Sequence, residues 1–170
     1  ALSSAASDVY KRQILNMQTP VGKEIGTAGY YAATVDHSIR AELTVTERTG
    51  MARYTFSSKE KQGTVIIGGG VAATSIQVAA IKITGPHSCE GYAEGGAFCG
   101  IPTPYKVYFV AEFDADAENF GTWKEERLHA NHTFAEGSHS GVYFTFPLKE
   151  GNQAVQYKLS LIHISEPTRP

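Results

Sequence analysis

The stretch from Gly29 to Phe56 constrains the fold most, because apolar and polar residues alternate along it with a period of two. Side chains two apart share one face of a strand, so the expected inward positions are Ile39, Ala41, Leu43, Val45, Ala52, Tyr54 and Phe56. Turn-forming residues interrupt the pattern at 36–38 and 48–50. The stretch therefore predicts three antiparallel strands with one buried and one wet face.

The rest of the chain repeats this kind of signal. Further strands are expected at 64–67, 75–84, 105–113, 141–147 and 154–158, with a Gly-rich loop at 85–104. No amphipathic helix of ten residues is evident, and 17 Gly, nine Tyr and eight Phe favour short strands joined by turns. The sequence predicts a single all-β domain, an antiparallel β-sandwich, over Ile14–Lys158.

The peptides at the two ends of the chain can be encoded by opposite strands of one DNA sequence. If Asp8–Gln13 is encoded as GAT GTG TAT AAG AGA CAG, the reverse complement, CTG TCT CTT ATA CAC ATC, encodes Leu159–Ile164. Selection on a protein would not produce that relation, whereas a sequencing adapter translated at both ends would. We therefore expect residues 1–13 and 159–170 to be translated adapter, and the domain to be incomplete at its N-terminus.

Charge and hydropathy exclude several function classes. The formal net charge is −2, with no basic stripe, so nothing predicts binding to nucleic acid or to a membrane surface. No apolar run reaches the 18 residues typical of a membrane span. The two cysteines, Cys89 and Cys99, fit either a disulfide or two free thiols.

Several short patterns resemble functional motifs but lack the context that those motifs need. Gly68–Ala73 has dinucleotide-site spacing without a βαβ unit, and Asp114–Glu118 has calcium-loop spacing without flanking helices. His129, His132 and His139 share one loop without a completing ligand. The carboxylates Glu42, Glu94, Glu112 and Asp114 present no distinctive pair for glycoside hydrolysis. We expect no catalytic residue and no metal site in this chain.

Three blocks, in order, carry a resemblance to a known family. Gly29–Phe56, with its A-E-L-T-x-T-x-R-x-G segment, is similar to part of glycoside hydrolase family 92, the calcium-dependent exo-α-mannosidases. Gly95–Gly100 and Tyr105–Trp123 resemble the next two blocks of that family's N-terminal β-sandwich domain. The resemblance implies a fragment of a secreted or periplasmic α-mannosidase that hydrolyses terminal α-mannosides with inversion.

The resemblance also implies that catalysis belongs to a different domain of the same chain. An (α/α) barrel of the same chain would supply the acid, the base and the calcium ligands, so this domain would be inactive alone and would help to shape the sugar pocket. The alternative is a stand-alone carbohydrate-binding sandwich. Its weak candidates for stacking on sugar are the aromatic residues Tyr92, Phe98 and Trp123.

Overall fold

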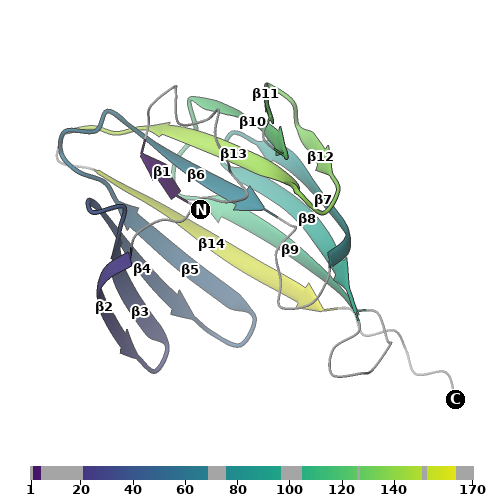
Figure 1. Cartoon of the computed structure of the whole chain (residues 1–170), viewed down its shortest axis with the longest axis horizontal. Coiled ribbons are helices and arrows are strands. Elements are labelled where there is room, and N and C mark those ends of the chain that lie inside the picture. The colour runs from purple at the N-terminus through teal and green to yellow at the C-terminus, as the bar shows by residue number, and fades with distance from the viewer. Residues whose placement is uncertain are drawn as a thin grey trace, which may run out of the picture.

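The structure, a computed structural model, describes residues 2–4, 21–68, 76–96, 105–125, 127–150 and 153–163. Within these ranges every regular element is a strand (Figure 1). None of the described residues forms a helix long and apolar enough to cross a membrane. The strands are β1 (Leu2–Ser4), β2 (Val21–Thr27), β3 (Tyr30–Val35), β4 (Ile39–Val45), β5 (Thr49–Thr55), β6 (Gln62–Gly68), β7 (Ile76–Gly85), β8 (Ser88–Gly95), β9 (Tyr105–Phe113), β10 (Asn119–Lys124), β11 (Arg127–Ala130), β12 (Phe134–Glu136), β13 (Ser140–Pro147) and β14 (Ala154–His163).

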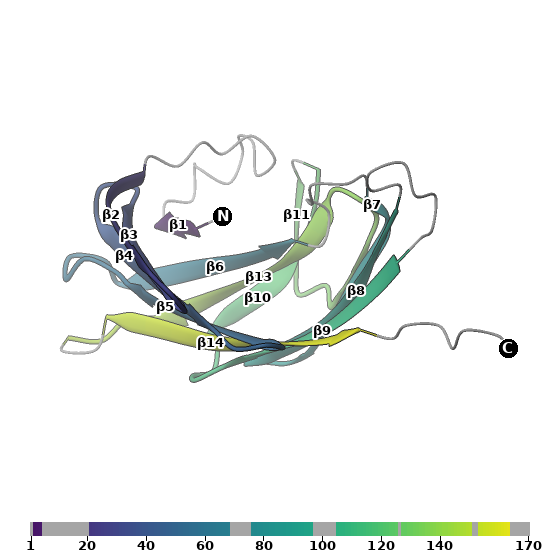
Figure 2. The same cartoon turned by 90° about the horizontal axis from the view of Figure 1, so that it is seen from below.

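The strands form two antiparallel sheets, which confirms the predicted all-β sandwich. The smaller sheet has the order β1-β6-β13-β10-β11, and the larger has the order β12-β7-β8-β9-β14-β5-β4-β3-β2. Figure 2 shows the nine-stranded sheet bent into a trough, with β6, β13 and β10 on its concave side. We call that concave side the inner face of the large sheet and the opposite side its outer face.

The meander β3-β4-β5 confirms the alternation predicted from the sequence. Ile39, Ala41, Tyr54 and Phe56 are buried on the inner face, whereas Arg40 and Arg53 are exposed. The turn between β3 and β4 has positive φ at Asp36 and His37 (50° and 60°), as a type I′ turn requires. The next turn lies at 46–48, before the predicted position, because Thr49 and Gly50 already belong to β5, where Thr49 pairs with Ser160 and Gly50 with Val45.

The predicted loop at 85–104 contains a strand, and this expectation was wrong. Strand β8 pairs with β7 and β9 in the middle of the large sheet. At Gly91 an added Cβ would lie 2.5 Å from the Ala80 carbonyl oxygen and 2.8 Å from the Phe109 ring. A glycine that looks like a loop residue is thus needed in the strand so that a ring of β9 can lie across it. Strands β1, β2, β10, β11 and β12 were also not predicted.

The core lies between the two sheets. The Phe113 ring is 4.9 Å from that of Phe144 and 4.8 Å from that of Phe146, at tilted angles favoured by aromatic pairs. The buried hydroxyls of Thr64 and Thr145 satisfy one another at 2.9 Å across β6 and β13. Because both faces of β13 are buried, this strand is the centre of the sandwich.

Strand β14 runs five residues beyond Lys158. Its main chain pairs with β5 as far as Ser160 and with β9 as far as His163. Leu159 and Leu161 continue the alternation of Val155 and Tyr157 toward the inner face. Main-chain pairing asks only for extended backbone and alternation, so the boundary at Lys158 remains a prediction from the coding relation.

Candidate functional site

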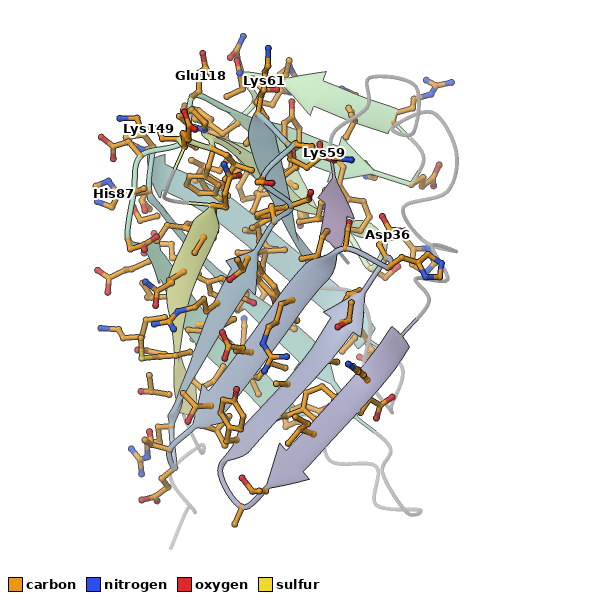
Figure 3. All side chains as sticks on the ribbon, turned by 90° about the vertical axis from the view of Figure 1, so that its left-hand side faces the viewer. Asp36, Lys59, Lys61, His87, Glu118 and Lys149 are labelled. Atoms are coloured by element: carbon orange, nitrogen blue, oxygen red, sulfur yellow. The ribbon has the colours of Figure 1, made fainter. Side chains whose placement is uncertain are left out.

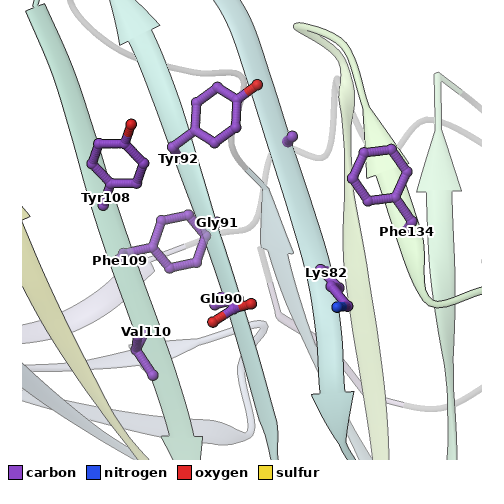
Figure 4. A pocket seen from close by; sticks show the side chains of 9 residues that line it. Lys82, Glu90, Gly91, Tyr92, Tyr108, Phe109, Val110 and Phe134 are labelled. Atoms are coloured by element: carbon purple, nitrogen blue, oxygen red, sulfur yellow. The ribbon is translucent and has the colours of Figure 1, made fainter.

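A shallow pocket of about 450 Å³ lies on the outer face of the large sheet, over β7, β8 and β9 and beside β12 (Figure 4). Its walls are mainly aromatic and aliphatic, and the residues that line it are Ala80, Lys82, Glu90, Gly91, Tyr92, Tyr108, Phe109, Val110 and Phe134. A volume within about 300–1,000 Å³ and a mostly apolar lining with a few polar groups are typical of small-ligand sites.

Strand register explains why these side chains meet. Tyr92 lies opposite Tyr108 on β9 and opposite Ala80 on β7. One row further on, Lys82 lies between Glu90 on β8 and Phe134 on β12. The small Ala80 leaves a hollow in front of the larger side chains of its neighbours. Figure 4 shows the two tyrosines on adjacent strands and Phe134 across the hollow.

A lysine supports the tyrosine pair from the side away from the hollow. The Tyr92 and Tyr108 rings are 5.7 Å apart and inclined at 47°. Lys106 Nζ lies 3.9 Å from the Tyr92 ring centroid and 5.5 Å from that of Tyr108, a cation–π arrangement. Glu94 Oε2 holds the same ammonium at 3.8 Å. These contacts restrict the rotamers of both tyrosines before any ligand arrives.

The polar groups at the pocket are available to form hydrogen bonds with a ligand. Among the described residues, the side chains of Lys82 and Glu90 have no hydrogen-bond or ion-pair partner, and neither do the hydroxyls of Tyr92 and Tyr108. An ammonium, a carboxylate and two phenols therefore surround an apolar floor. This combination suits a ligand that has both C–H surface and hydroxyl groups.

A second hollow on the same outer face, over β3, β4, β5 and β14, differs in that its polar groups are already engaged. Tyr30 donates to Glu42 at 2.8 Å, and Arg53 Nε donates to Gln156 at 3.0 Å. Gln156 in turn donates from its main chain and its side chain to Asp114. We interpret this surface as a stabilising polar network.

Charged side chains also gather at one end of the sandwich. Figure 3 shows Lys59, Lys61, Lys149 and Glu118 at this end. Gln62 Nε2 donates to Glu118 at 3.4 Å, and the side chains around this bond line an open hollow. Like the surface over β3–β5, this end is a solvated face that offers no enclosed site.

The three aromatic residues predicted for sugar stacking have different outcomes. Tyr92 lies in the pocket, and Phe98 lies outside the described residues. The prediction that Trp123 could stack on sugar is wrong, because only 4% of this residue is exposed. Its ring lies on Gly141 and Gly68, beside Ile66 and Tyr143. An indole covered in this way has no free face for a sugar. Tyr108 and Phe134 were not among the predicted candidates, although Tyr108 lies in the strand predicted at 105–113.

The short patterns weighed earlier do not assemble metal sites in the described part of the chain. Asp114 accepts hydrogen bonds from Gln156, and Asp116 lies 2.8 Å from His87 Nδ1. The His129 and His132 rings are 5.3 Å apart, but no group of three His, Cys, Asp or Glu side chains converges among the described residues. Asp114 and Asp116 therefore do not form, with other described side chains, the set of oxygen ligands that a calcium ion needs. Gly68 ends β6, and the rest of that Gly-rich motif lies outside the described residues.

Cys89 is a buried free thiol under the pocket, on the inner face of β8. Burial, followed by the charge of Glu90, raises the pKa of this thiol from 9.0 to about 12. In a Cys99→Ser background, we expect Cys89 to resist a thiol reagent at pH 8 until urea unfolds the chain, because both thiolate and access are lacking. Rapid labelling of the folded chain would contradict this burial.

The same pKa shift has a consequence for stability. Between pH 9 and about pH 12 the unfolded chain loses the thiol proton while the folded chain keeps it. The contribution of Cys89 to the free energy of unfolding is therefore complete below pH 9 and is lost as pH rises toward 12. Urea titrations of the Cys99→Ser chain at pH 8 and pH 10.5 should show a lower midpoint at the higher pH, less so when Cys89→Ala is added.

Several solved structures share this fold. The fold matches the inverting mannosidase BT2199 of Bacteroides thetaiotaomicron VPI-5482 with a TM-score of 0.70 and 20% identity, over 86% of this chain and 19% of that one. It matches the α-mannosidase BT3965 of Bacteroides thetaiotaomicron with a TM-score of 0.72 and 19% identity, over 86% and 20% of the two chains. The glycosyl hydrolase ccman5 gives a TM-score of 0.68 at 19% identity, over 84% and 20%.

The present chain thus spans about a fifth of the length of these solved structures. A search of curated protein sequences gives no significant match. The model of the glycosyl hydrolase family 92 N-terminal domain, however, matches residues 4–161, which is nearly the whole chain. The chain therefore belongs to the glycosyl hydrolase family 92 N-terminal domain family.

Proposed function

We propose that this chain is the N-terminal domain of a longer α-mannosidase that hydrolyses terminal α-mannosides with inversion. The observation that carries the proposal is the family match over residues 4–161, together with a fold that accounts for about a fifth of each similar mannosidase. In this proposal the remaining length supplies the catalytic (α/α) barrel, and the protein is secreted or periplasmic.

The carboxylates of the described residues support a non-catalytic role for this domain. Inverting glycosidases place an acid and a base about 6.5–9.5 Å apart across the scissile bond. Here the four candidate carboxylates have other partners on the outer face of the sheet: Glu42 with Tyr30, Glu94 with Lys106, Glu112 with Lys158 and Asp114 with Gln156. The proposal assigns the acid, the base and the calcium ligands to the catalytic domain.

The inner face of the large sheet supports contact with another domain. The small sheet covers the end near Ile39 and Phe56, whereas Tyr31, Val45 and Leu161 on the same face are 36%, 64% and 41% exposed. In Figure 1, β2 to β5 extend away from the small sheet toward this exposed end. Apolar side chains that share one face are a usual mark of an interaction surface, and the catalytic domain is the proposed occupant.

Activity of the complete protein tests the proposal. The full reading frame would be recovered from the source DNA, expressed and given an aryl α-mannoside, with the anomer of the released mannose followed by NMR. We expect the complete protein to release β-mannose first and the 170-residue chain to release none. Retention of configuration, or no hydrolysis of any α-mannoside by the complete protein, would contradict it.

One observation favours a second candidate, a stand-alone carbohydrate-binding module. Residues of this chain alone form a pocket of about 450 Å³ around Tyr92 and Tyr108. The length of the natural reading frame separates the two candidates, since a free-standing module would end soon after Lys158.

A further inference from the structure

We propose that the outer-face pocket over β7, β8 and β9 is a saccharide-binding site. The pocket is formed by Tyr92, Tyr108, Phe134, Lys82 and Glu90, and it would hold one end of a glycan chain. The inference deepens the proposed function, because the choice of a mannose-containing glycan as ligand rests on it.

The apolar part of the pocket fits the C–H face of a sugar ring. Tyr92 and Tyr108 form one wall, Phe134 stands on the other side of Lys82, and Ala80 forms a flat floor between them. Phe134 is 55% exposed, so much of its ring surface is open to a ligand. Aromatic rings supply a large contact area for little lost side-chain entropy.

The polar part fits hydroxyl groups. Lys82 donates and Glu90 accepts, and among the described residues neither has a partner that would compete with a ligand. Both side chains lie one row from the tyrosines, so a ring stacked on the aromatic wall would place its hydroxyls between them. A sugar hydroxyl both donates and accepts, and one ring can therefore satisfy both groups.

A wholly apolar ligand fits less well. It would take water away from the Lys82 ammonium and the Glu90 carboxylate without replacing those hydrogen bonds, which is unfavourable for charged groups. An extended peptide is also disfavoured, because the pocket lies on the face of the sheet, where the main-chain groups are already paired between strands.

The wall is held in place before binding. Lys106 contacts the Tyr92 ring from the side away from the hollow, and Glu94 holds Lys106. Lys106 is thus a positioning residue. Lys106→Met keeps the aliphatic stem and should weaken binding less than removal of Tyr92 does, whereas a ligand that binds Lys106 itself would show the opposite order.

Calorimetric titration of the 170-residue chain tests the site, with an α-mannotriose and a β-glucan trisaccharide as probes. We expect α-mannotriose to bind with a Kd of about a millimolar. Tyr92→Ala and Tyr108→Ala should each weaken it about tenfold, which corresponds to about 1.4 kcal/mol. Tyr30→Ala is the matched control, because Tyr30 is an exposed tyrosine over the other half of the same outer face.

Glu90→Gln provides a second variant that does not threaten the fold, since Glu90 is exposed. It keeps the shape and removes the charge, and it should weaken binding by a few-fold, with circular dichroism confirming that each variant is folded. The site is overturned if neither probe binds, or if Tyr30→Ala weakens binding as much as Tyr92→Ala does.

Failure of this inference is distinguishable from failure of the proposed function. If the complete protein hydrolyses an aryl α-mannoside but the chain binds no saccharide, the enzyme assignment stands and the site is refuted. If the chain binds saccharide through Tyr92 but the complete protein hydrolyses no α-mannoside, the site stands and the enzyme assignment is refuted.

Discussion

Replacing Phe144 by alanine is expected to lower the free energy of unfolding by about 3–5 kcal/mol, the usual cost of emptying a buried aromatic site. Phe144 is fully buried on β13, and its ring lies within 4.9 Å of Phe113, 6.3 Å of Phe120 and 6.4 Å of Phe146. Both sheets contribute these neighbours, so the resulting cavity cannot be closed by moving one strand. Urea unfolding followed by tryptophan fluorescence would measure the loss, because the single Trp123 is buried.

Phe134→Ala is the matched control for this prediction. It removes the same atoms from a ring that is 55% exposed, and a surface substitution of this kind usually changes stability by about 0.5 kcal/mol or less. Equal losses for the two variants would mean that the core does not lie between the sheets at β13.

Gly141→Ala should destabilise the domain by about 3 kcal/mol or more, which is at the upper end for overpacking. An added Cβ would lie 2.2 Å from the Ile67 carbonyl oxygen and 2.6 Å from Trp123 Nε1. The first contact is with the main chain of β6, so relief requires β6 and β13 to separate. Moving Trp123 away would empty the space that its indole fills over Gly68.

Gly22→Ala tests whether the effect comes from packing. Gly22 lies in β2 with no atom within 4 Å of the position of a Cβ, so alanine should leave the urea midpoint nearly unchanged. A Gly141→Ala chain as stable as the Gly22→Ala chain, with unchanged Trp123 fluorescence, would contradict the close approach of β6 and β13.

Where the sequence predicted the fold well, the signal was local. Alternation of apolar and polar residues is sufficient to locate β4 and β9, and the predicted bounds of β9, Tyr105–Phe113, are those of the structure. Such a pattern records only whether each side chain faces the core or water. That information is present in the strand itself.

Where the prediction failed, the deciding contact joins residues far apart in the sequence. Strand β8 was taken for a loop because its glycines look like turn residues, whereas Gly91 is required by the Phe109 ring of the neighbouring strand. Trp123 was a weak candidate for sugar stacking, but the flat surface that buries it consists of Gly68 and Gly141, which become neighbours only when β6 pairs with β13.

The candidate site likewise combines a residue that the sequence could identify with partners that depend on contacts between distant parts of the chain. Tyr92 could be selected as an aromatic candidate, but its partners depend on register: Tyr108 through β8 and β9, and Phe134 through β7 and β12. Strand β12 has only three residues, too few for a periodic signal. The pocket is therefore a product of sheet topology, and the sequence alone identified one of the four aromatic residues that line it, Tyr92.

The large sheet separates two roles by its two faces. Its inner face holds the core and ends in the exposed apolar side chains Tyr31, Val45 and Leu161. Its outer face holds the pocket around Tyr92 and, beside it, the polar network around Gln156. Because neighbouring residues of a strand point to opposite faces, changes that alter ligand contacts on the outer face need not disturb the core.

A sequencing read of the source DNA through the codon for Lys158 tests the central claim most directly, since that claim is that this chain is one domain of a longer hydrolase. The account predicts that the natural codons diverge from those of Leu159–Pro170 and that the frame continues for several times the length of this chain into a second domain. A stop codon immediately after Lys158 would contradict it, because no catalytic domain would then follow the sandwich.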